Sequence, residues 1–304
     1  MPAKLVCFYY MRDMQKIKLI HNPTAGSAAY SKKELMQIIE SAGYQCDYYS
    51  SKKEGWKVIE KGTDMIIIAG GDGTVRKLTK AFLKDDKMDS DIPVGLLNLG
   101  TANNLVRTLR IKGEPGELIE TYRKERIRKF DTGIIKGLPE SQFFLESCGF
   151  GVFPQLMNEM RKTEIHDIGA ALQVMVEIIK SAKPFQCKIN ADDNETEDKY
   201  ILVEVMNSPW MGPSLHMNAI SDPGDGKFEL VTIKEDERDR FIEFIKGNMA
   251  DGSGAFSHHP VQFEKLSITA DSQFFHADDD LIKIKTNTPL KVRMRKEFLK
   301  FMVP

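Results

Sequence analysis

The segment of the sequence best suited to bind a phosphate is Gly70-Gly71-Asp72-Gly73-Thr74. It directly follows the apolar run Met65–Ala69, which is typical of a buried strand, and directly precedes a helical stripe that begins at Val75. Glycines let the backbone turn tightly and approach a ligand closely. The N-terminus of the following helix offers free N–H groups and the positive end of its dipole. Thr74 adds a hydroxyl donor, and Asp72 can organise the turn or a metal-bound phosphate.

Two further loops combine glycine with small hydroxyl or amide side chains, each between a predicted strand and a predicted helix. Residues 22–27 read NPTAGS and residues 99–104 read LGTANN. In a parallel sheet such loops meet at the carboxyl ends of the strands, where ligands bind. A nucleotide lying across this rim is therefore predicted. The chain has neither the GxxxxGK[ST] phosphate loop nor the GxGxxG dinucleotide fingerprint.

The elements that must position these loops alternate over the first 110 residues. Apolar runs predict strands at residues 17–21, 45–49, 65–69 and 93–97. Helical spacing predicts helices near residues 35–42, 75–82 and 103–109, and a short one at 56–61. Repeated units of this length indicate an α/β domain with a doubly wound, Rossmann-like parallel sheet.

From about Arg126 the pattern changes to short strand-like runs, which predict a β-rich second domain. Its one predicted helix carries an apolar stripe over Ile165–Ile179, interpreted as core packing. The charge-rich segments 84–91 and 192–199 are predicted to be solvated loops, and Leu5–Met11 an extra edge strand.

Composition excludes several classes of protein. The 304 residues (34.5 kDa) carry 43 basic and 44 acidic side chains, so a dedicated nucleic-acid binder is not expected. No apolar run approaches the roughly 18 residues of a membrane span. The cysteines form no CxxC pair and the six histidines show no metal spacing, so a soluble cytoplasmic protein without disulfides or zinc is predicted.

The motifs NPTAG, GGDGT and LGTANN, in this order, resemble the diacylglycerol kinase catalytic-domain family, which includes bacterial lipid kinases and sphingosine and ceramide kinases. The resemblance extends over nearly the whole chain from Lys16. It implies an α/β ATP-binding domain (1–128) packed on a β-sandwich lipid-substrate domain (129–304), with the last residues allowed to return to the first domain.

The resemblance also implies roles for single residues. It places Asp280 as the general base and Asp72 in the catalytic centre, and it places a structural magnesium ion at Asp225 with help from Asp222 and Lys227. The residues that it implies contact ATP are Asn22, Ser51, Gly70, Gly71, Asp72, Gly73, Thr74, Gly100, Thr101 and Asn103.

Three positions depart from the family pattern. Arg76-Lys77 replaces the usual Asn-Glu, and the two cations are predicted to be either phosphate ligands or a solvated helix face. Asn104 stands where many members have Asp. The triplet Asp278-Asp279-Asp280 replaces Asp-Gly-Glu, so Asp278 or Asp279 is an alternative base, and a mere acidic turn is another reading.

Two segments of the second half bear on lipid and membrane. Alternating apolar and basic residues over Leu290–Arg295 predict a strand with one cationic face, suited to an anionic membrane or simply solvated. Apolar side chains of the loop 210–217 either line an acyl pocket or close the core. The predicted function is an ATP- and Mg²⁺-dependent lipid kinase acting on a diacylglycerol-like, phosphatidylglycerol or sphingoid alcohol at the inner membrane face. An NAD kinase and a weakly active or inactive nucleotide- or lipid-binding regulator are the alternatives.

Overall fold

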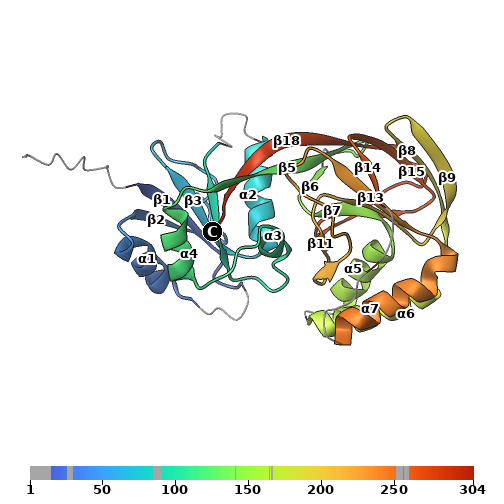
Figure 1. Ribbon diagram of the computed structural model, residues 1–304, viewed down its shortest axis with the longest axis horizontal. Coiled ribbons are helices and arrows are strands. Elements are labelled where there is room, and N and C mark those ends of the chain that lie inside the picture. Colours follow the sequence, from blue (N-terminus) through green and yellow to red (C-terminus); the bar gives the residue numbers. More distant parts are fainter. Residues whose placement is uncertain are drawn as a thin grey trace, which may run out of the picture.

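Four parallel strands form the centre of the first half of the molecule in the computed structural model (Figure 1), which describes residues 15–25, 30–84, 91–140, 142–163, 165, 167–250, 256 and 260–304. Every residue of β3 is buried, because the run MIIIAG lies between layers of helices on both faces. The four strands are β1 (Lys16–His21), β2 (Gln45–Ser50), β3 (Met65–Gly70) and β4 (Val94–Asn98).

Helices cover both faces of these strands (Figure 1). α1 (Lys32–Ser41) and α4 (Pro115–Tyr122) contact each other on one face. α2 (Asp72–Lys84) covers the other face, toward the second half of the molecule, and the short α3 (Asn104–Thr108) follows β4. The first strands and helices thus form the predicted doubly wound arrangement.

The first sheet continues without a break into the second half. Its order is β2-β1-β3-β4-β18-β15-β8-β9, with β5 paired to β18 and β6 paired to β5. Figure 1 shows β5 and β18 crossing side by side between the two halves. The added strands are β5 (Ile127–Lys136), β6 (Gln142–Phe144), β8 (Phe185–Ala191), β9 (Asn194–Tyr200), β15 (Lys265–Ala270) and β18 (Leu290–Met302).

A second, antiparallel sheet of six strands completes the sandwich, in the order β14-β13-β10-β7-β16-β17. One of its faces packs on the first sheet through side chains such as Phe150, Val203 and Val205. The fold class predicted from the sequence, an α/β domain packed on a β-sandwich, is confirmed. The strands are β7 (Ser147–Gly151), β10 (Leu202–Met206), β13 (Phe228–Ile233), β14 (Val261–Phe263), β16 (Phe274–Ala277) and β17 (Asp280–Lys283).

Three helices cover the outer face of the six-stranded sheet, where only one was predicted. They are α5 (Val152–Thr163), α6 (Ile168–Ser181) and α7 (Arg238–Ala250), and the turn η1 (Glu235–Glu237) precedes α7. Their apolar sides pack on Leu202, Met206 and Val231 of the sheet. The prediction of a single helix was therefore wrong, because α5 and α7 bury fewer residues and carry more charge than α6. The hairpin β11 (Trp210–Met211) and β12 (Leu215–His216) lies beside α3.

Two local predictions were wrong. Residues 56–61 form turns and not a helix, because the segment folds over the buried Lys18, whose ammonium donates to the Val58 carbonyl at 2.7 Å. Residues 194–199 belong to β9, paired to β8 through a two-residue turn at Asp192 and Asp193, both with positive φ. Charged side chains suit this edge strand because they oppose pairing with other chains. The predicted edge strand at 5–11 and most of segment 84–91 lie outside the described residues.

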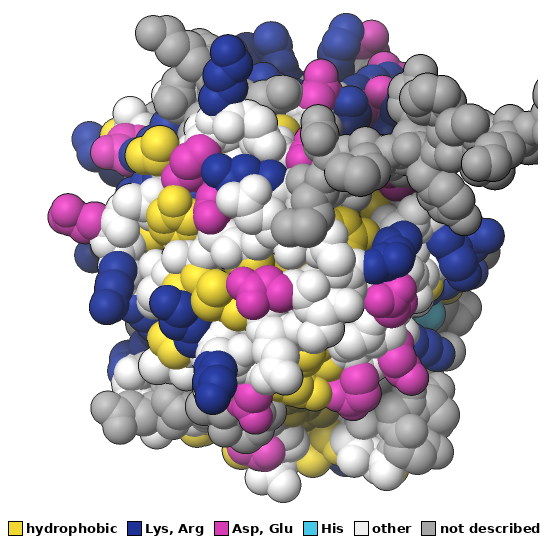
Figure 2. Space-filling model, turned by 90° about the vertical axis from the view of Figure 1, so that its left-hand side faces the viewer, with side chains coloured by type: hydrophobic (Ala, Val, Ile, Leu, Met, Phe, Trp, Pro, Cys, Tyr) yellow, Lys and Arg dark blue, Asp and Glu magenta, His cyan; other side chains and the backbone are white. Residues whose placement is uncertain are grey.

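The surface of the first half carries both signs of charge. Figure 2 shows the end of the molecule formed by α1 and β2, where basic and acidic side chains are interspersed. None of the helices in the described ranges is long and apolar enough to span a bilayer. The three cysteines of those ranges, Cys46, Cys148 and Cys187, are buried and unpaired.

Candidate active site

The loops after β3 and β4 touch each other through their glycines. A Cβ on Gly100 would lie 2.5 Å from the Cα of Gly71 and 2.3 Å from Asn103 Oδ1. A Cβ on Gly70 would lie 2.6 Å from the hydroxyl of Thr74. No side chain fits at these positions, so the glycines bring the start of α2 against the loop that precedes α3.

The first loop closes the same rim from the other side. The Asn22 N–H donates to the Ala69 carbonyl at 2.9 Å, which ties this loop to the end of β3. The side-chain oxygen of Asn22 accepts hydrogen bonds from the N–H and the hydroxyl of Thr24. These bonds hold the start of the first loop against the end of β3. Gly26 and Ser27 lie outside the described residues.

Asp72 links the two helix starts. Its carboxylate accepts the N–H groups of Asn104 at 2.9 Å and Leu105 at 3.1 Å, and so caps α3 from the first turn of α2. Burial, together with the charges of Asp279 and Asp278, raises the pKa of Asp72 to about 6. Asn103, in the left-handed region at φ 53°, donates to the Gly100 carbonyl at 2.7 Å, and its buried Oδ1 has no partner among the described residues.

A carboxylate from the second half lies beside Asn104. The Asn104 amide donates to Glu146 at 2.8 Å and to the Gly212 carbonyl at 3.1 Å, while its own buried oxygen accepts no hydrogen bond in the part of the chain that the structure describes. Burial first, and repulsion from Asp72 second, raise the pKa of Glu146 well above its ordinary value. Glu146 thus returns a carboxyl group to the rim beside Asn104, which stands where many family members have Asp. Sequence reasoning missed Glu146, because only the fold brings residue 146 to residue 104.

Arg76 points away from the rim and is buried between the halves. Its guanidinium donates to Asp278 at 2.5 Å, to Asp280 at 2.7 Å and to the Phe143 carbonyl at 2.9 Å. It also lies over the Phe143 ring, 4.3 Å from the centroid. Arg76 is therefore neither a solvated residue nor free to bind phosphate. Lys77, one residue later, is exposed and lines the rim.

A cavity of about 670 Å³ opens between the halves and joins two kinds of wall. One wall is the polar rim, with Asn22, Gly71, Asp72, Gly73, Thr74, Gly100 and Thr101. The other is apolar and comes from α5, α6 and the β11–β12 turn. Its residues include Phe153, Leu156, Met157, Met160, Ile165, Ile168, Ala171 and Met211. The stripe that was interpreted as core packing therefore also faces the cavity at its N-terminal end.

Asp279 and His276 complete the cavity on the side of β16. Asp279 lines the cavity, and enclosure by its walls, followed by repulsion from Asp278, raises the pKa of Asp279. His276 bonds to the buried Glu204 at 2.8 Å and to the Asp278 carbonyl at 3.1 Å. Burial opposes the charged form of His276, but Glu204 raises its pKa overall. Asp280 is absent from the cavity wall.

Ser51 lies in a neighbouring hollow of about 960 Å³ between the segment after β2 and the exposed face of α2. The Ser51 hydroxyl is buried, and no residue that the structure describes forms a hydrogen bond with it. Lys77 lines both this hollow and the cavity, so the two spaces meet at its side chain. The hollow is also lined by Trp56, Lys57, Lys61, Lys80 and Lys84.

The residues predicted to hold a structural magnesium ion lie together in one loop, away from the cavity. Asp222 pairs with Arg128 at 2.8 Å, and Asp225 accepts the Lys227 N–H at 2.9 Å. The Asp222 carbonyl accepts the Asp225 N–H. Both carboxylates thus accept hydrogen bonds within the chain, and a magnesium ion here stays a prediction.

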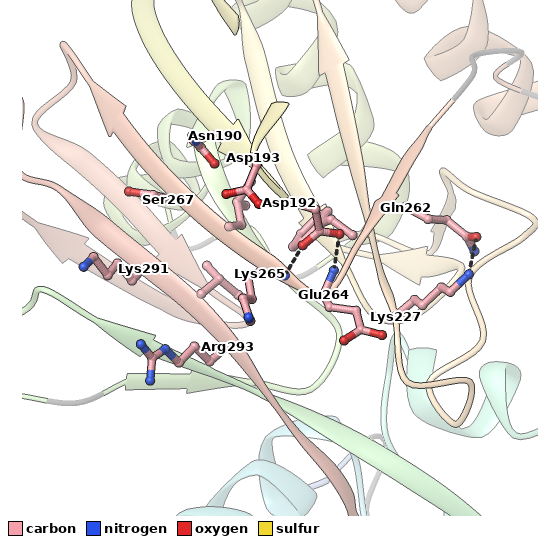
Figure 3. Close-up of a pocket in the computed structure, with 13 residues that line it drawn as sticks. Asn190, Asp192, Asp193, Lys227, Gln262, Glu264, Lys265, Ser267, Lys291 and Arg293 are labelled. Atoms are coloured by element: carbon pink, nitrogen blue, oxygen red, sulfur yellow. Dashed lines mark hydrogen bonds between the residues drawn. The ribbon is translucent and has the colours of Figure 1, made fainter. Parts of the chain in front are cut away.

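Lys227 also lines a groove of about 490 Å³ on the outer face of β14, β15 and β18 (Figure 3). Lys291 and Arg293 of the predicted cationic strand face lie in it, together with Lys265. Acidic side chains share the groove, since Asp192, Asp193 and Glu264 line it too. The cationic strand face thus lies beside acidic groups.

Magnesium bound with a nucleotide takes one or two carboxylates together with phosphate oxygens. No three acidic, histidine or cysteine side chains of the described ranges form a metal cluster by themselves. Asp72 and Glu146 repel each other across the rim, and the buried Asn104 Oδ1 meets no hydrogen-bond donor within the described ranges. These residues fit a cation that is shared with phosphates.

A glycine-rich rim on a doubly wound sheet, facing an acidic cavity with an apolar wall, defines a phosphotransferase of the α/β-plus-sandwich type. Residues 16–135 match the family model of the diacylglycerol kinase catalytic domain. This segment is therefore similar to a diacylglycerol kinase catalytic domain, and the chain is a kinase. The resemblance read from the three motifs is confirmed.

Relatives of known name agree with this assignment. The chain is 25% identical to the diacylglycerol kinase of Bacillus subtilis (strain 168) over 241 residues, which are 75% of this chain and 77% of that one. It is 22% identical to a diacylglycerol kinase of Staphylococcus saprophyticus over 273 residues, 86% of each chain. The fold matches the crystal structure of a diacylglycerol kinase from Bacillus anthracis with a TM-score of 0.72 at 21% identity, covering 96% of this chain and 98% of that chain.

Proposed function

We propose that the protein is an ATP- and magnesium-dependent kinase that transfers the γ-phosphoryl group to the hydroxyl of a lipid. The observation that carries the proposal is the single cavity that joins the rim to the apolar wall of α5 and α6. Phosphate fits the rim and acyl chains fit the wall. The reacting hydroxyl then lies between them, beside the carboxylates of the site.

The rim and its acidic neighbours suit this chemistry. Phosphoryl transfer depends on positioning and on neutralising charge more than on covalent steps. The first turn of α2 supplies backbone N–H groups, Thr74 a hydroxyl and Lys77 an ammonium. Ser51, with its unpartnered hydroxyl, suits a contact to the nucleoside part in the adjoining hollow. Magnesium, held by Asp72 and Glu146 together with the phosphates, would neutralise their charge.

The lipid alcohol enters along the apolar wall. Diacylglycerol, phosphatidylglycerol and sphingoid bases all carry a hydroxyl on an apolar body, and the shape of the wall decides between them. Access to such substrates places the enzyme at the cytoplasmic surface of a membrane, as a peripheral protein.

Transfer of label from γ-labelled ATP into a panel of these lipids, with magnesium, tests the proposal, and NAD is offered in a parallel reaction. Met157→Trp fills the apolar wall, and Asn158→Trp, on the next and equally half-buried position of α5, is the matched control. We expect Met157→Trp to reduce the amount of labelled lipid and Asn158→Trp to leave it unchanged. Label in NADP would establish an NAD kinase instead, and ATP binding without transfer would establish a regulator.

A further inference from the structure

The triplet 278–280 forms the β16–β17 hairpin turn, and its three carboxylates point in different directions. Ala277 pairs with Asp280, so Asp278 and Asp279 are the two turn residues. Asp278 takes a positive φ of 46°, as the first residue of such a tight turn commonly does. Because the turn reverses the chain, the three carboxylates differ in their hydrogen-bond partners.

Asp278 anchors the turn. Its buried carboxylate accepts the N–H groups of Leu145 at 2.9 Å, Glu146 at 2.8 Å and Ser147 at 3.3 Å. It also receives the Arg76 guanidinium at 2.5 Å. With this many donors around it, Asp278 has no oxygen left for a substrate hydroxyl.

Asp280 faces α2 and not the cavity. Its Oδ2 accepts from Arg76 at 2.7 Å, and its side chain is absent from the cavity wall. Arg76 thus holds the residues on either side of Asp279 with one planar guanidinium, whose fork can bind two carboxylates at once.

Asp278 and Asp279 both line the cavity, but only Asp279 has a side chain that accepts no hydrogen bond from the residues the structure describes. A methyl group placed on Gly73 would lie 3.7 Å from Asp279 Oδ2, so this oxygen faces the phosphate loop directly. The Asp279 carbonyl accepts from Arg161 of α5 at 3.1 Å, which steadies the turn from the apolar side.

We propose that Asp279 is the general base of this kinase, and that Arg76 is the positioning residue that directs it into the cavity by holding Asp278 and Asp280. The inference rests on the proposed function and deepens it. It differs from the assignment of the base to Asp280 that the family resemblance implies. The substrate hydroxyl transfers its proton to Asp279 Oδ2 while the hydroxyl oxygen bonds to the γ-phosphorus of ATP. The bond between the γ-phosphorus and the bridging oxygen breaks at the same time, and ADP leaves with that oxygen.

Arg76 also sets the spacing between donor and base. It stands on the first turns of α2, the helix that begins with the phosphate loop, and its partners stand on the hairpin that carries Asp279. An error of 1 Å in such spacing costs about 10²-fold in rate. Arg76→Met is therefore expected to lower kcat roughly 10- to 100-fold at unchanged KM for ATP.

Three carboxamide variants test the base. Asp279→Asn is expected to lower kcat by about 10²- to 10⁴-fold with ATP binding retained. Asp280→Asn is expected to lose no more than about tenfold, because Arg76 keeps its bonds to Asp278 and Phe143. Asp193→Asn is the matched control, since Asp193 is the second residue of the other two-residue Asp-Asp turn, in the β8–β9 hairpin.

Arg76→Lys and Arg76→Met separate positioning from folding. Lysine keeps the charge but not the fork, so Arg76→Lys is expected to recover part of the kcat lost in Arg76→Met. A merely structural role would lower thermal stability and ATP affinity together and leave kcat per folded molecule unchanged. That result would overturn the role of Arg76.

Two rates are measured for each variant: transfer of labelled phosphate to lipid and, when no lipid is present, slow transfer to water. ATP binding is measured for each variant by calorimetry. A larger loss in Asp280→Asn than in Asp279→Asn overturns the inference and leaves the proposed function standing. If the wild-type protein labels no lipid but hydrolyses ATP, and Asp279→Asn abolishes this hydrolysis, the proposed lipid substrate is overturned. The role of Asp279 as the base is then supported. A wild-type protein that binds ATP and transfers its phosphate to neither acceptor overturns both.

Discussion

Replacing Gly100 by alanine tests whether the contact between the rim loops sets the geometry for phosphate. The added Cβ would lie 2.5 Å from the Gly71 Cα, against an ordinary contact distance of 3.4–4 Å. The two backbones must therefore separate by about 1 Å. Gly100 has no positive φ, so alanine suits its backbone and only the lack of space opposes it.

The expected loss follows from that displacement. Crowding of this kind costs about 1–3 kcal/mol of unfolding free energy. A displacement of about 1 Å at the phosphate loop lowers the rate of transfer roughly 10²-fold. ATP binding by calorimetry and transfer of labelled phosphate measure the two effects on the site, and urea unfolding measures the stability.

Gly116→Ala is the matched control, because a Cβ on Gly116 meets nothing within 4 Å. Gly116 lies in α4, where alanine is expected to stabilise by up to about 1 kcal/mol. If Gly100→Ala binds ATP and transfers phosphate as the wild-type protein does, the close approach of the loops has no part in catalysis and the reasoning is refuted.

Three further predictions concern charged groups of the site. Because the pKa of Asp72 is raised to about 6 from 3.8, its contribution to stability is complete below about pH 4 and is lost as the pH rises through 6. Asp72→Asn should therefore reduce the fall in the free energy of urea unfolding between pH 4 and pH 8 by on the order of 1–3 kcal/mol. An unchanged pH dependence of the unfolding free energy would contradict this. Arg76→Met leaves the buried Asp278 without its cation and should lower the unfolding free energy by roughly 3 kcal/mol, measured by urea unfolding; an unchanged midpoint would show that the ion pair adds nothing. Lys77→Glu should weaken ATP binding roughly 3- to 10-fold and most strongly at low salt, whereas Lys33→Glu on α1 should not, and equal effects would show that Lys77 acts only through net charge.

The rim of the site was predictable because its signals are local. Gly70 and Gly71 come directly after a uniformly apolar run, which predicts a buried strand. The glycines must therefore lie at the carboxyl end of that strand. The same holds for Asn22 and Gly100. Parallel strands place such loops at one edge whatever the rest of the chain does.

The opposite wall was not predictable, because it depends on contacts between distant residues. Arg76 was predicted to be solvated or phosphate-bound, yet its partner Asp278 is 202 positions away. Whether Asp279 or Asp280 faces the cavity depends on the pairing of Ala277 with Asp280, and a shift of one residue would exchange their directions. Glu146 gave no signal, since a single carboxylate between two apolar strands has no periodic pattern.

The path of β18 bears on how the chain becomes a folded enzyme during its synthesis. Phe301 pairs with Val94 in the first sheet, and Phe298, Leu299, Phe301 and Met302 are buried in the core of the first half. Domains made first at the ribosome generally fold first. Here the first half lacks a strand and part of its core until residues 290–302 have been synthesised, so we expect the glycine-rich rim to reach its final form only late in synthesis.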